Sequence, residues 1–211
     1  SGKTVLMSVL GDKYSVPDEN GFFLNPLNRE TFEYCIKTVA DMRKGYWPEV
    51  TEPGQTVNLQ WNLYKAKENR TTENLGEVTM MDFAGEVYRA AFGGKKVQES
   101  FQKDVDSLQA YVLGCNKLLL LINLKDIIDG DKSKERTIDM LWASKSIMDY
   151  AIENGVNDIA IAFTQSEQYS SIIAECGGPR DTLKKYHGLM AALQPNIDVF
   201  ALSAVRNTVV N

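Results

Sequence analysis

Strict alternation of apolar and polar residues marks residues 57–63, where Val57, Leu59, Trp61 and Leu63 are separated by Asn58, Gln60 and Asn62. This period of two is typical of a strand with one buried face, and we expect an edge strand here. A second strand is predicted over residues 78–83. The two strands form a hairpin around a polar turn at residues 69–76. The segment before residue 28, which is polar and punctuated by Gly and Pro, is predicted to be a loop.

Apolar residues recur at helical spacing in four longer segments. The first starts near Asn28, a good N-cap, and stops at Gly45. The others cover residues 97–112, 134–154 and 182–193. In the helix over 134–154 we expect the following residues to face inward: Ile138, Leu141, Trp142, Met148 and Ile152. Residues 5–10, followed by Gly11, suit the first turns of a further helix.

Three further apolar runs lie between or after these helices, at residues 117–123, 159–163 and 197–202. Short, continuous apolar runs of this kind are typical of strands covered on both faces. Alternating helices and strands predict an α/β fold with a mainly parallel sheet, helices on both faces and an antiparallel edge strand. The length of 211 residues fits one domain.

Charge and cysteine content narrow the classes of function. The formal net charge is −5, so the chain lacks the basic surface that binding to nucleic acid requires. The three cysteines are widely spaced, which argues against a disulfide framework or a zinc site and favours a cytoplasmic protein. The longest apolar run is far too short to span a membrane.

The first four residues, Ser1, Gly2, Lys3 and Thr4, match the end of the phosphate-binding pattern G-x-x-x-x-G-K-[ST]. In that pattern glycine N–H groups wrap the phosphates, lysine reaches the outer phosphates and the Thr hydroxyl binds Mg²⁺ at a helix N-terminus. The triplet Gly2-Lys3-Thr4 alone is also compatible with an ordinary helix N-cap. Three further motifs strengthen its interpretation as part of a phosphate-binding loop.

The second motif is D-x-x-G at residues 82–85, directly after a predicted strand. There Asp82 would hold Mg²⁺ through water, and the N–H of Gly85 would face the γ-phosphate. Residues 164–167, Thr-Gln-Ser-Glu, follow the next-to-last strand, where a base-reading motif [NT]-K-x-D belongs. Ser203 and Ala204 close the last strand and match a motif that lies against guanine. All four motifs occur in the expected order at strand ends, where ligands bind in α/β sheets.

On these residues the chain resembles the TRAFAC class of P-loop GTPases, Ras-like in layout. The helical insertion at residues 28–44, the segment Gly-Tyr-Trp-Pro-Glu-Val-Thr at 45–51 and the D-x-x-G-E motif are similar to bacterial double-GTPases. The resemblance implies a three-layer P-loop fold with the helical insertion before switch I. It also implies that Thr51 is the switch I threonine that closes on Mg²⁺ and the γ-phosphate, with Thr56 as the alternative.

The resemblance further implies that residues 1–211 form a single GTPase domain. Its first strand and the glycine end of its P-loop are expected before Ser1. In the Ras-like layout that strand lies centrally, between the strands ending at Asp82 and at Asn123. Without it, the backbone groups along the two neighbouring strands would lack partners, at about 1–3 kcal/mol each.

Two departures from the family pattern affect the expected chemistry. Glu86 stands where Ras-like enzymes have the glutamine that orients water, and an ionised carboxylate cannot donate a hydrogen bond, so we expect slow turnover. Gln165 and Glu167 replace the usual lysine and aspartate. Glu167 still provides an acceptor for guanine N1–H and the exocyclic amine. Alternatively, Glu86 is an ordinary surface residue at the start of a helix, where the helix dipole favours a carboxylate.

The sequence thus predicts a magnesium-dependent switch that binds GTP or GDP, hydrolyses GTP slowly and acts through a protein effector or activating partner. The alternative is a pseudo-GTPase that serves as a nucleotide-binding or protein-interaction module. A P-loop ATPase or kinase is a third option, disfavoured by Ser203-Ala204. His187, the sole histidine, is expected to be a packed residue and not a catalyst.

Overall fold

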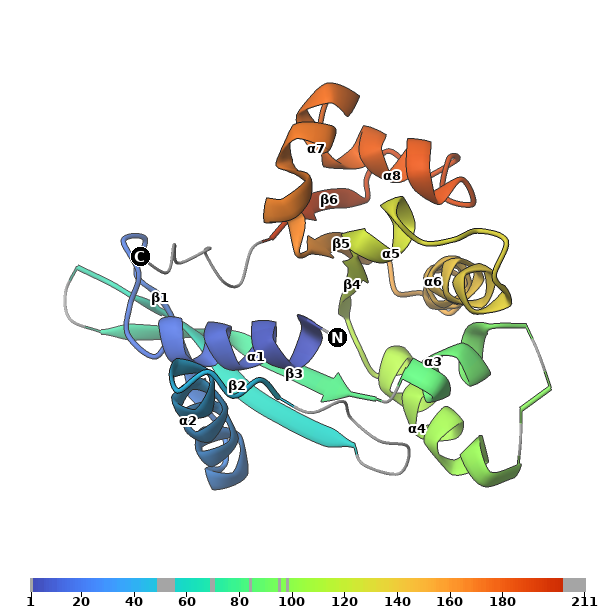
Figure 1. The fold of residues 1–211 in the computed structure, drawn as a ribbon. Coiled ribbons are helices and arrows are strands. Elements are labelled where there is room, and N and C mark those ends of the chain that lie inside the picture. The colour runs from blue at the N-terminus through green and yellow to red at the C-terminus, as the bar shows by residue number, and fades with distance from the viewer. Residues whose placement is uncertain are drawn as a thin grey trace. The chain divides into compact units, whose positions relative to one another are not determined.

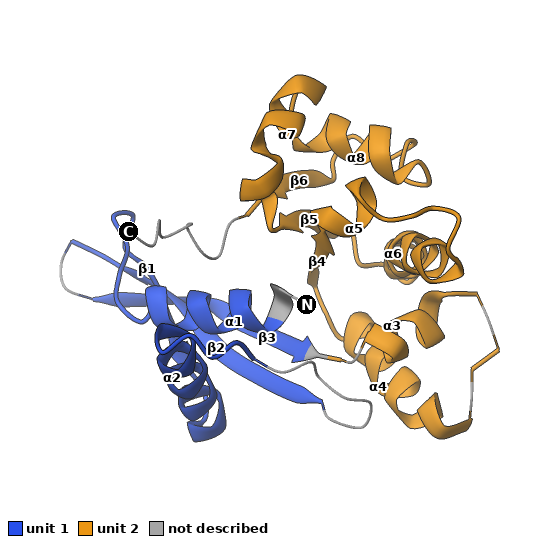
Figure 2. Cartoon of the chain, in the orientation of Figure 1, with its two compact units in different colours: residues 1–82 blue, residues 83–211 orange. Residues whose placement is uncertain are grey.

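The computed structural model describes residues 2–48, 56–68, 71–83, 85–94, 96–97 and 99–202, with the side chains of Lys3 and Asp82 left out. It divides into two compact units, Ser1–Asp82 and Phe83–Asn211 (Figure 2). Each unit is described by itself below. The expectation of a single domain stays a prediction.

The first unit contains helices α1 (Gly2–Lys13) and α2 (Arg29–Arg43) and strands β1 (Phe22–Pro26), β2 (Val57–Ala66) and β3 (Thr72–Asp82). The strands form an antiparallel sheet in the order β1-β2-β3 (Figure 1). The hairpin is confirmed, but β3 begins at Thr72, inside the segment that we expected to be the turn at residues 69–76. The loop prediction before Asn28 was wrong, because β1 forms there and pairs with β2. That pairing makes β2 a central strand and corrects its expected position at the edge.

The core of the first unit lies where α1 and α2 meet β2. Its fully packed side chains are Met7, Cys35, Leu59 and Trp61. Gly11 does not end α1, which continues to Lys13. A Cβ on Gly11 would lie only 2.9 Å from Cys35 Sγ, so glycine permits the close approach of α1 to this core.

Helix α2 begins and ends as its sequence predicts. The Asn28 side chain accepts a hydrogen bond from the Thr31 N–H at 2.8 Å, and Gly45 follows the helix with φ 89°. Cys35 is buried, whereas Phe32 and Ile36 are about half exposed.

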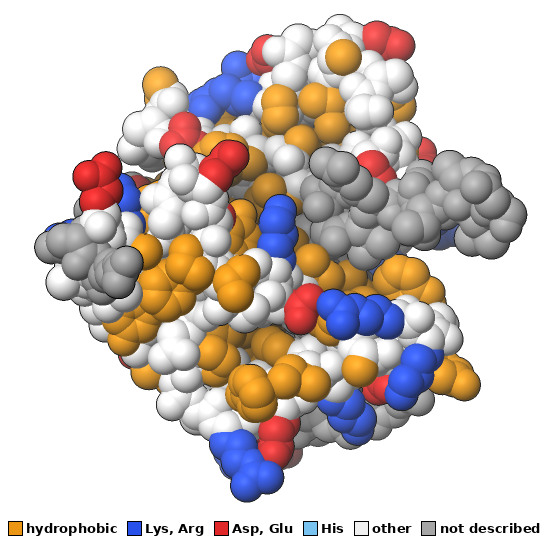
Figure 3. All heavy atoms as spheres, turned by 90° about the vertical axis from the view of Figure 1, so that its left-hand side faces the viewer, with side chains coloured by type: hydrophobic (Ala, Val, Ile, Leu, Met, Phe, Trp, Pro, Cys, Tyr) orange, Lys and Arg blue, Asp and Glu red, His pale blue; other side chains and the backbone are white. Residues whose placement is uncertain are grey.

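The face of the molecule in Figure 3 shows many hydrophobic side chains, drawn in orange.

The second unit holds a parallel sheet in the order β4-β5-β6, formed by β4 (Lys117–Asn123), β5 (Asp158–Thr164) and β6 (Asp198–Ala201). Its helices are α3 (Gly85–Phe92), α4 (Gln102–Leu113), α5 (Leu124–Ile128), α6 (Glu135–Glu153), α7 (Ser170–Cys176) and α8 (Pro179–His187). Two short 3₁₀ helices, η1 (Glu99–Phe101) and η2 (Ser166–Tyr169), complete it. All three predicted strands are confirmed.

Two helix predictions in this unit needed correction. Helix α8 ends at His187 and does not reach residue 193, because Gly188 has φ 74° and breaks the helix. In α6 the expected inward positions are only partly buried. Leu141 and Met148 are buried, but Ile138 and Trp142 are 50% and 45% exposed.

The chain is therefore an α/β protein with one parallel and one antiparallel sheet. The single, mainly parallel sheet that we expected is not present among the described residues. β3 is the last strand of the antiparallel sheet and β4 the first of the parallel sheet, so each has one edge without a partner strand among those residues. Within the same residues, no helix is both long and apolar enough to cross a membrane.

Candidate functional site

The predicted phosphate-binding residues occupy the start of α1. Gly2, Lys3 and Thr4 form its first turn, and Thr4 is 6% exposed. A helix N-terminus concentrates free N–H groups and partial positive charge, which suits a phosphate. Ser1 and the Lys3 side chain lie outside the described part of the chain. The helix start is compatible with the phosphate-binding motif and with an ordinary helix N-cap, and the contacts of Lys3 remain a prediction.

The D-x-x-G motif joins a strand end to a helix start. Asp82 is the last residue of β3, opposite Val57, and Gly85 is the first residue of α3. Among the described atoms, a Cβ on Gly85 would meet only Arg89 Nη1, at an ordinary 3.5 Å. The fold itself therefore does not require glycine at position 85, which leaves close approach of a ligand as a reason for it. The Asp82 side chain is outside the described atoms.

Glu86 lies in the first turn of α3 and pairs with Arg89 at 3.2 Å. Its own backbone N–H and the Arg89 guanidinium lower the pKa of the Glu86 carboxyl. Glu86 is thus ionised at neutral pH and is an acceptor only. Both its role toward water and the surface alternative stay compatible with this position. Thr51 lies outside the described residues, and Thr56 is exposed just before β2.

The predicted base-reading residues follow β5 directly. Thr164 ends the strand and is buried, and Gln165 then adopts a left-handed conformation with φ 58° and ψ 30°. It is the only residue other than glycine with positive φ in the described part of the chain. Such a conformation is uncommon for glutamine and costs energy, so it occurs where the surroundings enforce it.

Glu167 lies in η2, two residues after this turn. Its Oε2 atom is buried and has no hydrogen-bond partner among the described residues. A buried carboxylate oxygen without a donor is costly, and such atoms are rare in folded proteins. Glu167 therefore keeps an unused acceptor among the described residues, and its contact with a base stays a prediction.

The end of β6 is hydrogen-bonded to the same loop. The Ser166 hydroxyl donates to the carbonyl of Leu202 at 2.8 Å, and the Leu202 N–H donates to Phe163 O at 2.8 Å. Ser203 and Ala204 follow Leu202 in sequence and lie outside the described residues. The structure therefore brings the loop of Gln165 and Glu167 next to the residue that leads into the predicted Ser203-Ala204 motif.

Arg180 at the start of α8 holds the chain that leads into β6, a role that the sequence analysis missed. Its guanidinium donates to four backbone carbonyls, those of Leu193, Gln194, Pro195 and Ile197, at 2.5–3.4 Å. No sequence motif could reveal this contact, because every acceptor is a main-chain group. Arg180 thus holds the approach to β6, the strand that is followed by Leu202, the hydrogen-bond partner of Ser166.

His187 is a packed residue, as expected. It is 3% exposed, and its Nε2 lies 2.6 Å from Ser144 Oγ. Because Ser144 donates its hydroxyl proton to Leu141 O, the imidazole carries its proton on Nε2, and Nδ1 has no hydrogen-bond partner among the described residues. Burial is the main cause that lowers the pKa of His187 to about 4.

The described residues contain no group of three or more His, Cys, Asp or Glu side chains arranged to hold a metal ion. The predicted Mg²⁺ ligands Thr4, Asp82 and Thr51 are a hydroxyl, a carboxylate and a hydroxyl. This oxygen donor set suits Mg²⁺ bound together with phosphate oxygens and water. Thr4 and Asp82 belong to the first unit, whereas Gly85, Glu86, Gln165 and Glu167 belong to the second.

Comparison with known proteins adds no relative, since no protein-family model, curated protein or solved structure matches the chain.

Proposed function

We propose that this chain is the body of a magnesium-dependent, guanine-nucleotide-binding switch with slow GTP hydrolysis. The observation that supports it most is the loop after β5. There one carboxylate oxygen of Glu167 is buried without a hydrogen-bond partner among the described residues, and Ser166 is hydrogen-bonded to Leu202, the residue before Ser203. The loop expected to read the base is thus hydrogen-bonded to the residue that precedes, in sequence, the second motif expected to contact it.

The chemistry of Glu167 favours guanine. Guanine presents two donors, N1–H and the exocyclic amine, to a carboxylate, whereas adenine presents a bare acceptor at N1. The Glu167 carboxylate accepts hydrogen bonds from the two guanine donors and is repelled by the adenine N1 acceptor. The backbone N–H at Ser203-Ala204 supplies the complementary donor for guanine O6. Gln165 replaces a lysine whose stem would cover the ring, so the preference is smaller than in enzymes that carry lysine.

The phosphate end of the proposal rests on α1. Ser1, Gly2 and Lys3 hold the phosphates, and Thr4 with Asp82 and Thr51 positions Mg²⁺, which neutralises phosphate charge when bound. Gly85 senses the γ-phosphate through its N–H. Glu86 accepts a hydrogen bond from water without donating one. Catalysis is then mainly positioning and charge stabilisation.

A Ras-like three-layer fold belongs to this proposal. In that layout one central strand, which ends in the P-loop, pairs with the strand of Asp82 and with the strand of Asn123. β3 and β4 each have an edge without a partner strand among the described residues, as this layout requires of its two neighbours. Some hydrophobic residues of β4 are exposed, such as Leu119 at 49%. This exposure is explained if a further strand and its side chains cover the unpaired edge of β4.

The experiment is calorimetric binding of GDP and a GTP analogue to the natural full-length protein with Mg²⁺. Lys3→Ala should abolish tight binding, because it removes the cation that faces the outer phosphates. The matched control is Lys13→Ala, which removes a lysine from the last turn of the same helix. Binding by Lys3→Ala as tight as that of the wild type would refute the P-loop assignment.

The second candidate is a pseudo-GTPase that binds nucleotide without turnover. The observation in its favour is the ion pair of Glu86 with Arg89, which holds the carboxylate in its ionised form. The two candidates differ in one quantity, the single-turnover rate of GTP hydrolysis above the uncatalysed rate. Both place a guanine nucleotide at the same residues, and both act through a protein partner.

A further inference from the structure

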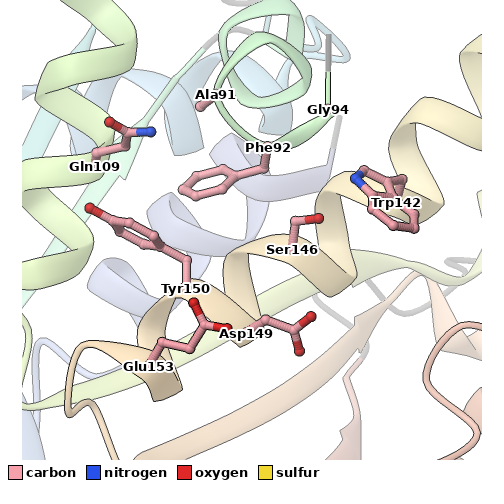
Figure 4. Close-up of a pocket in the computed structure, with 9 residues that line it drawn as sticks. All are labelled: Ala91, Phe92, Gly94, Gln109, Trp142, Ser146, Asp149, Tyr150 and Glu153. Carbon is pink, nitrogen blue, oxygen red and sulfur yellow. The ribbon is translucent and has the colours of Figure 1, made fainter.

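A pocket of about 340 Å³ lies among α3, α4 and α6 in the second unit (Figure 4). None of the residues proposed to bind nucleotide lines it. Its size is at the lower end of the range found for ligand sites. The lining combines aromatic rings with carboxylates, and the residues that matter most are Phe92, Gln109, Trp142, Asp149, Tyr150 and Glu153.

One face of α6 supplies most of this lining. Trp142, Ser146, Asp149, Tyr150 and Glu153 follow one another at intervals of three or four residues, apart from the adjacent pair 149–150. Residues at such spacing share a helix face. Figure 4 shows Phe92 of α3 and Ser146 between Trp142 and Tyr150, with Asp149 and Glu153 toward one side.

Two of the aromatic residues, Trp142 and Tyr150, are partly exposed, whereas Phe92 is buried. The rings of Phe92 and Tyr150 are 5.6 Å apart between centroids and tilted by 58°. Trp142 is 45% exposed, and Ile138, one turn earlier in α6, is 50% exposed. Exposed tryptophan is costly in water and is enriched at the centres of protein interfaces. Gly94 packs so closely that an added Cβ would lie 3.0 Å from Trp142 Nε1.

The carboxylates give this surface a negative charge. Lys145 pairs with Asp149 from the preceding turn. Glu153 is exposed, and the described residues offer it no ion pair. The lining itself contains no Lys, Arg or His. A cation is therefore favoured at this pocket, and an anionic ligand such as nucleic acid or phosphate is disfavoured.

We propose that this pocket binds an arginine side chain from a basic segment of a partner protein. A guanidinium is planar and weakly hydrated, so it stacks on Trp142 or Tyr150 while its N–H groups donate to Glu153. A neutral apolar ligand would leave the carboxylates unused. The proposal goes beyond nucleotide binding and does not depend on it, since no residue is shared.

The test uses N-acetyl-L-argininamide as the probe and its neutral isostere N-acetyl-L-citrullinamide as the control ligand. Binding to the full-length protein is followed by NMR, through the indole N–H of Trp142 and the amides of α6. A ligand of this size should saturate with a dissociation constant of about 1 mM. The citrulline compound should bind at least about tenfold more weakly, because its neutral urea group cannot form an ion pair with a carboxylate.

Two variants localise the site. Glu153→Gln should weaken argininamide binding about threefold to tenfold, and Trp142→Ala should weaken it similarly through loss of stacking. Glu175→Gln, which neutralises an exposed glutamate on α7, should leave it unchanged. The proposal is overturned if argininamide does not saturate the site. Equal binding of citrullinamide or of N-acetyl-L-lysinamide, or unchanged binding by Glu153→Gln, would overturn it as well.

Discussion

Leu202 accepts two hydrogen bonds from Ser166 through its carbonyl oxygen, one from the hydroxyl at 2.8 Å and one from the backbone N–H at 3.4 Å. The contact joins the residue after β6 to the first residue of η2, the short helix that contains Glu167. Because Ser203 comes next in the chain, we expect Ser166 to couple the two proposed base-binding motifs.

Ser166→Ala tests this coupling. The change removes the shorter of the two bonds and should cost about 1 kcal/mol of folding free energy. It should also weaken GDP binding, because the segment that leads to Ser203 is less well held. Ser107→Ala is the matched control. The Ser107 hydroxyl also donates to a carbonyl, that of Lys103 at 2.8 Å, but this hydrogen bond is exposed on α4. Equal GDP affinities in the two variants would contradict the coupling.

Arg180→Ala should destabilise the chain that leads into β6. Four carbonyls lose a charged donor, so we expect a loss of about 2 kcal/mol or more in unfolding free energy, with faster amide exchange in residues 198–202. Arg29→Ala removes an exposed ion pair to Glu33 on α2 and should change stability by less than about 0.5 kcal/mol. Unchanged exchange in residues 198–202 would mean that Arg180 does not hold β6.

Glu86→Gln tests whether the ionised carboxylate limits hydrolysis. Since Arg89 and the backbone lower its pKa, Glu86 cannot donate to water at neutral pH. Glutamine can both donate and accept, so the single-turnover rate of GTP hydrolysis should stay the same or rise. If Glu86 is instead a general base, the rate should fall, and a large fall would refute our reading.

Burial of His187 should lower the free energy of unfolding in acid. Its pKa is about 4 in the folded protein and about 6.5 when unfolded, so between these values the unfolded chain binds a proton that the folded chain does not. Stability should therefore fall as the pH decreases from 6.5 toward 4. Between pH 7 and pH 5 this group contributes a loss of about 2 kcal/mol.

Urea unfolding of the wild type and of His187→Gln at pH 7 and pH 5 measures this contribution. The variant lacks the only imidazole in the chain and should lose correspondingly less stability on acidification. An NMR titration that places the imidazole pKa in the native protein near 6.5 would contradict a buried, neutral His187.

Local signals predicted some of the boundaries correctly, whereas the start of β3 at Thr72 and the end of α8 at His187 were missed. The Asn28 cap, the stop at Gly45 and the end of β5 at Thr164 depend on neighbouring residues, which the sequence displays directly. β1 was missed because its pairing with β2 over Phe22–Pro26 is a long-range contact. The exposure of Trp142 was missed because a helical stripe does not show how wide its buried part is. The left-handed turn at Gln165 and the Arg180 contacts have no sequence signature.

Base choice tests the central claim most directly. GTP, ATP and XTP are compared by competition binding to the full-length protein and to its Glu167→Ala variant. Glu167 accepts from two guanine donors and repels adenine N1, so the wild type should prefer GTP over ATP by about 1–3 kcal/mol, and the variant should lose that preference. Equal binding of ATP and GTP by the wild type, or an undiminished guanine preference in Glu167→Ala, would contradict the account.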